Sequence, residues 1–328
     1  MSRILETIKI FKIEDVLNSE NKFKLLLKLI ITLALVIYLV YFLDLRHLAS
    51  LVKNGNQILV SIALLLVIVN ILFQYIKWKR IALLLLDEKN NRTILTSLFY
   101  GFTAGVFTPA RIGEYVGRGV IFKDKPMLDI TFATLFDKGF TFIVLTGFGL
   151  LSFTAFLMKK EILTYPLLAE LFLGVLVLIS AIYIFFKYGF SQKLNGVVAK
   201  YDSKFNLISK ILLIIREDKS NTIYLLMITI LYYLTFLAQF SILLIAFNAN
   251  ILFIEGIWIG SIVFFIKTLI PSITIGEIGI RETISMLIVT HFGIASELGF
   301  NAAFLLFTLN IIIPALVGLF FVIRFKYD

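Results

Sequence analysis

The sequence predicts an all-α polytopic membrane protein with about six full spans and two re-entrant helical hairpins, arranged as an inverted-topology repeat. Of its 328 residues, 60% are hydrophobic and only 16% are charged, whereas soluble domains are nearer half apolar and a quarter charged. Its apolar runs approach the ~20 residues that a helix needs to cross a bilayer. A charged pattern, G-E-x-x-x-R, begins at residue 113 and again at residue 276, so each half carries one copy.

Six apolar runs predict the full spans, at about 25–43, 58–76, 128–157, 164–186, 222–247 and 300–323. Lysine and arginine gather in the first 28 residues, in a second region that begins at Lys77, in the central loop and at the C-terminus. The positive-inside rule therefore places these four regions, and both termini, on the cytoplasmic side of a plasma (inner) membrane. Residues 1–24 are predicted to form an amphipathic segment on the cytoplasmic surface. The first apolar run lacks a small-residue cleavage site and is predicted to stay as an anchor.

Two further apolar segments, about 94–121 and 257–292, contain the charged pattern. On the positive-inside map the first begins and ends in the cytoplasm and the second begins and ends outside. Each is therefore predicted to be a re-entrant hairpin, and the two enter from opposite faces. Proline breaks a helix and glycine permits close backbone approach, which predicts the hairpin tips at Thr108, Pro109, Gly113, Pro271, Ser272, Gly276 and Gly279. The alternative is two ordinary extra spans per segment, joined by a tight turn.

The spacing between the two motifs also relates the other apolar runs. It brings 58–76 onto 222–247, and 128–157 close to the last run. This order predicts a single membrane domain over 1–328, with pseudo-repeat halves 1–160 and 161–328. In inverted repeats, substrate sites lie near the bilayer midplane between broken helices.

The charged residues of the two motifs are candidates for binding a substrate, because ionisable groups at membrane depth are costly. Arg111, Glu114 and Arg118 share one helical face, and one carboxylate between two guanidiniums leaves positive charge suited to phosphate oxygens. Glu277 and Arg281 stand at i and i+4, where they can pair. The predicted substrate-binding set is Arg111, Glu114, Arg118, Asp137, Lys138, Lys267, Glu277, Arg281 and Glu282. The alternative is that these ion pairs only staple the hairpin tips.

Polar residues also interrupt two of the spans. Asp137 and Lys138 are adjacent, so they point about 100° apart on a helix, and one of them is expected to meet a hairpin charge. Asn70 and Gln74 lie one turn apart in the second span. They are expected to form hydrogen bonds between helices.

Several classes of function are disfavoured by what the sequence lacks. It has no cysteine and only two histidines, which gives no support for a metal site. No nucleotide-binding loop or nucleophile–base pair is present, so we predict no cofactor, no catalytic residue and no enzyme activity. The net charge of +10 comes from basic residues at the ends of apolar runs, which argues against binding nucleic acid.

The motif regions F-T-P-A-R-I-G-E-Y-V-G-R, at 107–118, and P-S-I-T-I-G-E-I-G-I-R-E, at 271–282, resemble the two signature regions of the lysylphosphatidylglycerol synthase transmembrane-domain family of flippase-like proteins. The resemblance extends over essentially the whole chain and implies an integral membrane protein that moves or handles polar lipids. The soluble aminoacyl-transferase domain of the fused members has no counterpart in this sequence. The residues that carry the match are Pro109, Arg111, Gly113, Glu114, Arg118, Pro271, Gly276, Gly279, Arg281 and Glu282, and the chain departs at Glu277, where many relatives have glycine.

The leading hypothesis from the sequence is a flippase-like lipid transporter. It would move or bind an anionic phospholipid, or a lipid-linked phosphate, between leaflets, and its partners would be membrane lipids. The alternatives are an intramembrane enzyme acting on a lipid phosphate, a transporter of small solutes or ions, and a membrane partner of a separate lipid-modifying transferase.

Overall fold

The computed structural model is helical and contains no strand over the residues that it describes, which are 45–122, 124–161, 207, 210–211, 214–215, 217–270 and 279–324. The helices are α3 (Leu45–Asn54), α4 (Gln57–Leu86), α5 (Asn91–Val106), α6 (Gly113–Gly119), α7 (Met127–Lys159), α11 (Lys219–Ala246), α12 (Phe253–Leu269), α13 (Ile280–Thr290), α14 (Ser296–Phe307) and α15 (Ile313–Arg324), with the π-helical turn η3 (Thr308–Ile312) between the last two. The predictions for residues 1–24, 25–43 and 164–186, and for Pro271, Ser272, Gly276 and Glu277, lie outside the described residues.

Four helices among the described residues are long and apolar enough to cross a membrane. They are α4, α7, α11 and the continuous stretch from Ser296 to Phe321. They coincide with four of the six predicted apolar runs, at 58–76, 128–157, 222–247 and 300–323. The chain is therefore an α-helical membrane protein of the multi-pass type.

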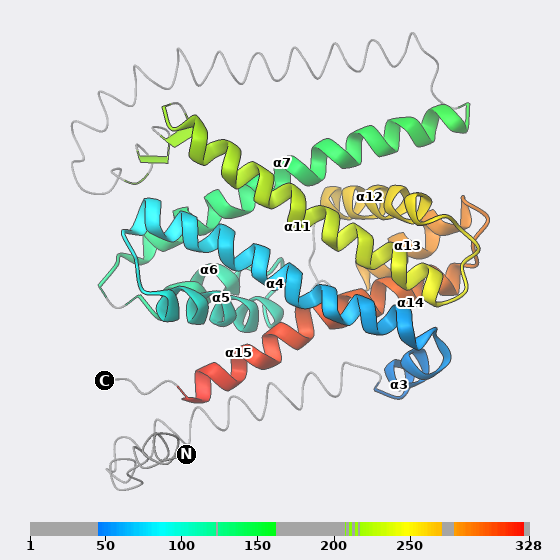
Figure 1. Cartoon of the computed structure of the whole chain (residues 1–328), viewed down its shortest axis with the longest axis horizontal. Coiled ribbons are helices and arrows are strands. Elements are labelled where there is room, and N and C mark those ends of the chain that lie inside the picture. The colour runs from blue at the N-terminus through cyan, green and yellow to red at the C-terminus, as the bar shows by residue number, and fades with distance from the viewer. Residues whose placement is uncertain are drawn as a thin grey trace, which may run out of the picture.

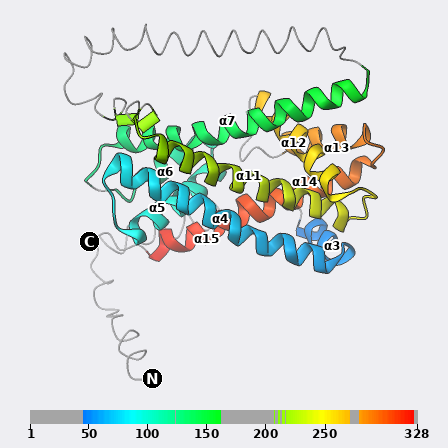
Figure 2. The same ribbon diagram turned by 45° about the horizontal axis from the view of Figure 1, so that its top comes forward.

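The long helices form the centre of the molecule, and the short ones lie toward its two ends. α4 and α11 run side by side, and both also contact α7. In Figure 1, α5 and α6 lie toward the left-hand end, whereas α12 and α13 lie toward the right-hand end. Figure 2 shows the same separation after rotation. α5 and α6 therefore lie toward one end of the bundle, and α12 and α13 lie toward the other.

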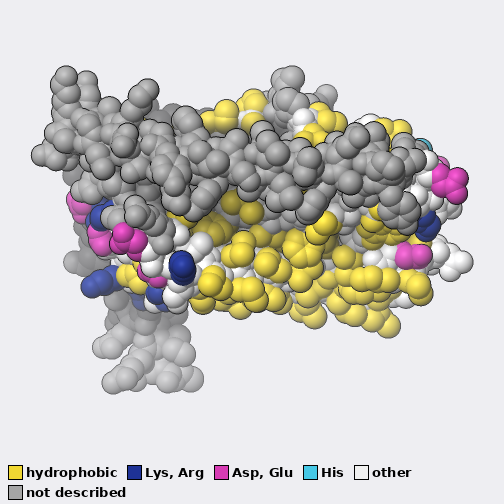
Figure 3. All heavy atoms as spheres, turned by 90° about the horizontal axis from the view of Figure 1, so that it is seen from above, with side chains coloured by type: hydrophobic (Ala, Val, Ile, Leu, Met, Phe, Trp, Pro, Cys, Tyr) yellow, Lys and Arg dark blue, Asp and Glu magenta, His cyan; other side chains and the backbone are white. Residues whose placement is uncertain are grey.

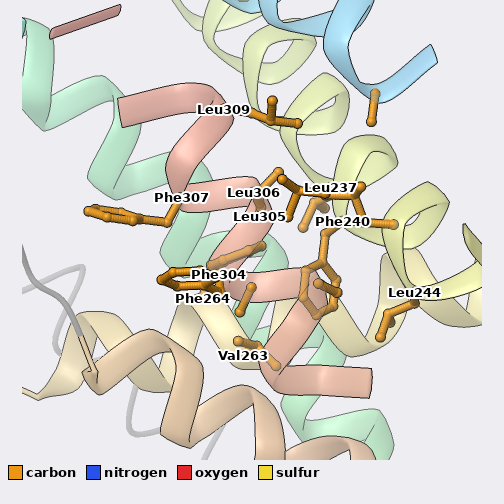
Figure 4. Packing of buried hydrophobic residues seen from close by; sticks show 14 of the residues in the cluster. Leu237, Phe240, Leu244, Val263, Phe264, Phe304, Leu305, Leu306, Phe307 and Leu309 are labelled. Carbon is orange, nitrogen blue, oxygen red and sulfur yellow. The ribbon is translucent and has the colours of Figure 1, made fainter. Parts of the chain in front are cut away.

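The main hydrophobic core joins α11, α12 and α14. Figure 4 shows Phe240 and Phe264 pointing toward each other and toward Phe304. The centroids of the first two rings are 5.5 Å apart, in an edge-on arrangement, which is a favourable geometry for aromatic pairs. This packing fixes α12 and α14 against α11, and so fixes one wall of the cavity described below.

Much of the outer surface is apolar. The side chains of Ile58, Leu65, Ile68 and Leu151 are 63–73% exposed, and Figure 3 shows a hydrophobic band between two ends that carry the charged residues. An exposed apolar surface of this size needs an apolar solvent or partner. The band is what a lipid bilayer would cover.

The chain reverses between α5 and α6 in a strained turn. α5 ends just before Thr108 and Pro109, and Ala110 and Arg111 both adopt positive φ, at 50° and 56°. Positive φ is uncommon for residues other than glycine and often marks functional sites. The Thr108 hydroxyl accepts a hydrogen bond from the Gly113 N–H at 2.7 Å, and so satisfies one donor at the start of α6.

The hairpin depends on glycines that face the partner helix. A Cβ on Gly117 would lie 2.5 Å from the Tyr100 carbonyl oxygen and 2.7 Å from the Ala104 Cβ. By contrast, a Cβ on Gly147 in α7 would meet nothing within 4 Å.

We therefore expect Gly117→Ala to lower the free energy of unfolding by about 1–3 kcal/mol, because overpacking forces the two helices apart. The matched control, Gly147→Ala, should be neutral or stabilising by up to ~1 kcal/mol, because alanine is the better helix former. Thermal unfolding of both variants in one detergent tests the difference. Equal melting temperatures for the two variants would contradict the close packing of α5 and α6.

Candidate functional site

Glu114 is the centre of a buried ion-pair network. It lies in the first turn of α6 and is 1% exposed. Its carboxylate lies 2.7 Å from Arg118 Nη2, 2.7 Å from Lys138 Nζ and 3.2 Å from Arg111 Nη2. One carboxylate thus holds three cations, which come from the strained turn, from α6 and from α7.

Asp137 is the second carboxylate of the network. Its Oδ2 lies 2.9 Å from Arg118 Nη1, and its Oδ1 lies 2.8 Å from Lys77 Nζ. Lys77 belongs to α4 and also donates to the Thr141 hydroxyl at 2.8 Å. The ion pairs of the network therefore hold α4, α6 and α7 together.

Arg118 is the buried link between the two carboxylates. Its guanidinium donates to Glu114 and Asp137 and lies 4.3 Å from the centroid of the Trp78 ring. A desolvated cation–π contact of this kind contributes about 2 kcal/mol. The Trp78 indole N–H in turn donates to the Ser97 hydroxyl at 2.7 Å. Arg118 therefore holds the Glu114 and Asp137 carboxylates in position. The more exposed cations of the network are Arg111 and Lys138.

The network carries surplus positive charge. Its charged members are Lys77, Arg111, Glu114, Arg118, Asp137 and Lys138, which is four cations against two carboxylates. Lys77 and Arg118 are buried, whereas the side chains of Arg111 and Lys138 are 22% and 33% exposed. The excess charge is therefore presented by Arg111 and Lys138.

Arg111 and Lys138 open onto a central cavity of about 430 Å³. Lys267 at the end of α12 and Arg281 at the start of α13 also line this cavity. The rest of the lining is largely aromatic, apolar or uncharged and consists of Gln74, Phe102, Ala110, Glu114, Tyr115, Thr141, Phe142, Leu145, Tyr232, Tyr233, Phe236, Phe264, Thr268, Asn310 and Ile311. Within the described lining, four cationic side chains face one carboxylate.

Among the described residues of the second motif region, Arg281 makes an aromatic contact, and Gly279 and Glu282 form a helix cap. The Arg281 guanidinium lies 5.2 Å from the centroid of the Phe307 ring. The Glu282 carboxylate accepts the Gly279 N–H at 2.8 Å and so caps the start of α13. Gly279 has φ +92°, which a side chain rarely adopts. Glu282 is 1% exposed and does not line the cavity, so it acts as a helix cap.

Three amide side chains, those of Asn70, Gln239 and Asn310, are joined by hydrogen bonds beside the cavity. Asn70 donates to the side chains of Gln239 and Asn310, which places one amide between α4, α11 and η3. The hydrogen bonds expected of Asn70 are confirmed, whereas Gln74 lines the cavity. Pro314 has no N–H to complete the helical ladder, which accounts for the π-helical turn that carries Asn310. Such turns often occur at functional sites.

The structure brings most of the predicted residues together. Arg111, Glu114, Arg118, Asp137 and Lys138 form one network, in which both members of the adjacent pair in α7 meet a charge of the first hairpin. Lys267 and Arg281 line the same cavity as Arg111 and Lys138. Glu277 lies outside the described residues.

The position of Lys77 differs from the one that the sequence predicts. It was expected to begin a cytoplasmic loop, but α4 continues to Leu86 and Lys77 is 3% exposed. Asn70, Gln74 and Lys77 stand at i, i+4 and i+7, so they share one helical face. That polar stripe was the signal that Lys77 points into the bundle.

The described residues contain no group of three metal-ligating side chains. The site is instead a cation-rich cavity with aromatic walls, inside a bundle of membrane-spanning helices. That combination defines an α-helical integral membrane protein with a cation-lined internal cavity.

The comparison with known families agrees that the chain is a membrane protein and identifies its family. The chain belongs to the family described as the lysylphosphatidylglycerol synthase TM region, whose model matches residues 25–318. No curated protein and no solved structure matches the chain.

Proposed function

We propose that this protein binds the phosphate-bearing headgroup of an anionic lipid, or of a lipid-linked phosphate, in its central cavity and moves that lipid between leaflets. The observation that carries the proposal is the charge of the cavity. Among the described lining residues, the cations are Arg111, Lys138, Lys267 and Arg281, and the carboxylate is Glu114. That carboxylate is itself in contact with three cations of the network.

The cavity suits a headgroup in size as well as in charge. Its volume of about 430 Å³ lies within the range of ~300–1,000 Å³ that is usual for small-molecule sites. Arginine offers two parallel donors to phosphate oxygens, and lysine adds a compact charge. Phe142 lines the cavity and is also 57% exposed on the surface of α7. This position allows a headgroup to lie inside while the acyl chains stay in the bilayer.

We further propose that α5–α6 and α12–α13 are re-entrant hairpins that enter from opposite faces of the membrane. Their positions toward opposite ends of the bundle support this. The chain would then have six full spans and form one domain, with inverted halves 1–160 and 161–328 in which α4 corresponds to α11 and α7 to α14–α15. Basic residues such as Lys89 and Arg92, beside the end of α4, would face the cytoplasm. Both termini would lie there, in the plasma (inner) membrane.

In this scheme transport needs no nucleotide, and the protein performs no covalent chemistry. Rocking of one half against the other would expose the cavity to each face in turn. The lipid gradient, the membrane potential or an ion gradient would supply the energy. The lipid itself would come from a separate lipid-modifying enzyme, as a partner of this chain.

Lipid binding by the purified chain tests the headgroup site. Native mass spectrometry of the wild type should show more copies of an anionic phospholipid retained than of a zwitterionic lipid with the same chains. Removing one charge-assisted hydrogen bond costs about 1.5–3 kcal/mol. The double variant Arg111→Gln, Lys138→Gln should therefore lose anionic-lipid binding by at least ~10-fold.

The control for this experiment is Lys210→Gln. Lys210 is 40% exposed and pairs at 3.4 Å with Asp87, an exposed residue that caps the end of α4. The control removes a cation that does not line the cavity and should bind as the wild type does. Equal loss in both variants, or no preference for the anionic lipid in the wild type, would reject the headgroup site.

A further inference from the structure

A second pocket lies at the other end of the helices that line the central cavity. It has a volume of about 300 Å³ and lies beside the end of α7, the start of α12 and the end of α13. The same three helices contribute to the central cavity. In Figure 1 this is the right-hand end of the molecule, away from α5 and α6.

The lining of this pocket, which we call the end pocket, combines basic and aromatic side chains. Lys159, Lys160 and His291 provide the basic groups, and Phe156 and Phe292 provide the walls. The two phenylalanine rings stack with their centroids 5.4 Å apart, and the His291 ring meets Phe156 edge-on at 6.0 Å. The pocket is therefore built by side chains that pack on one another.

The carboxylate in the end pocket already has a structural role. Glu255 accepts a hydrogen bond from the Leu252 N–H at 3.0 Å and so caps the start of α12. Lys159 lies 5.3 Å from the centroid of the Trp258 ring, and the Trp258 N–H donates to the Ser152 carbonyl of α7 at 2.8 Å. α7 and α12 are thus tied together beside the pocket, and one lysine is held in position there.

An aromatic barrier separates the end pocket from the central cavity. Phe153 of α7 lies 6.0 Å from Phe265 of α12, measured between ring centroids, and the Phe265 side chain packs directly on Gly149. Along α7, the central cavity ends at Leu145 and the end pocket begins at Phe156, a rise of about 16 Å at 1.5 Å per residue. The two cavities are therefore distinct and lie in line along the same three helices.

We propose that the end pocket is a second binding site for a phosphate-bearing anion, held by Lys159 and Lys160 beside His291. The chemistry is that of a phosphate ester, whether it arrives as a lipid headgroup or as a soluble molecule. The lysines supply charge-assisted donors, and the phenylalanines supply an apolar wall for the carbon atoms next to the phosphate. The lining of the end pocket shares no residue with that of the central cavity, and its occupancy can be measured without any movement of lipid.

The two histidines of the chain make the test specific. His291 is exposed in the end pocket, whereas His47 lies on α3, where its Nε2 is 3.2 Å from the Asn301 side chain. Diethyl pyrocarbonate modifies accessible histidines, and peptide mass spectrometry reports each rate separately. The full chain is labelled in zwitterionic nanodiscs, in nanodiscs that also contain an anionic phospholipid, and in zwitterionic nanodiscs with added glycerol phosphate.

Ligand present at ten times its dissociation constant should slow modification of His291 by about 10-fold, because only the free fraction reacts. The rate at His47 should not change. Protection by the anionic lipid alone would identify a lipid headgroup as the ligand, and protection by glycerol phosphate as well would identify the phosphate ester itself. Both results support the site.

The variant Lys159→Ala, Lys160→Ala should abolish the protection of His291, whereas Lys53→Ala should preserve it. All three lysines are exposed and lie at helix ends, so none is needed for the core. Unchanged modification of His291 with both probes would overturn the proposal, and so would protection that persists in the double variant. Loss of central-cavity binding in Arg111→Gln, Lys138→Gln would leave this result unaffected, so the two proposals fail separately.

Discussion

Replacing Asp137 with asparagine is expected to lower the free energy of unfolding by about 3–5 kcal/mol, the cost of removing one partner from a buried ion pair. The carboxylate lies 2.8 Å from Lys77 Nζ and 2.9 Å from Arg118 Nη1, and both cations are buried. Asparagine keeps the shape but leaves these two charges without that carboxylate. Thermal or denaturant unfolding in a single detergent measures the effect.

Asp124→Asn is the matched control, because it removes the same charge from an exposed position just before α7. It should change the stability by no more than ~0.5 kcal/mol. A double-mutant cycle with Lys77→Met adds a second check. The double variant should be less destabilised than the sum of the single variants, by about 0.5–3 kcal/mol. Additive effects, or an Asp137→Asn variant as stable as its control, would show that the network does not hold α4, α6 and α7 together.

Neutralising both Arg111 and Lys138 is expected to slow leaflet exchange of an anionic lipid by at least ~10-fold, and by ~100-fold if each cation contributes a charge-assisted hydrogen bond in the transport step. These are the partly exposed cations of the network, and both line the central cavity. Lys77 and Arg118 are buried behind them. The double variant Arg111→Gln, Lys138→Gln should therefore lose exchange. Because both cations also pair with the buried Glu114, its stability is measured alongside.

Reconstituted vesicles with a fluorescent anionic lipid, read out by quenching from outside, measure this exchange. The control is Lys210→Gln, whose exposed lysine pairs with Asp87 outside the cavity. A double variant that exchanges lipid as fast as the control would show that the cavity cations do not handle the headgroup. Unfolding curves of the same preparations separate a loss of binding from a loss of fold.

The sequence was sufficient to predict a helical membrane protein and the clustering of the charged residues around Glu114. Hydropathy marks four runs that the structure shows as long apolar helices, because the length of a bilayer-crossing helix is set by the bilayer itself. The face shared by Arg111, Glu114 and Arg118 follows from helical spacing, and these residues do form ion pairs.

Local sequence patterns could not predict which charged residues pair across the helix bundle. A lysine at the end of an apolar run can extend to the membrane surface or turn inward to a carboxylate. Lys77 turns inward because Asp137, 60 residues later, lies 2.8 Å away. Glu282 was predicted to bind the substrate because it belongs to the second motif region. In the structure its carboxylate accepts the Gly279 N–H and caps α13. In both cases, the spacing of residues along the sequence does not reveal the contact that determines the role of the side chain.

In the proposed function, the cavity selects a lipid by the negative charge of its headgroup. The most direct measurement compares leaflet exchange of an anionic and a zwitterionic lipid with identical chains, in vesicles containing the wild-type protein. Selection by charge predicts that the anionic lipid exchanges at least ~10-fold faster, the value of one charge-assisted hydrogen bond, and that Arg111→Gln, Lys138→Gln removes the difference. Equal rates for the two lipids, or exchange no faster than in protein-free vesicles, would contradict it.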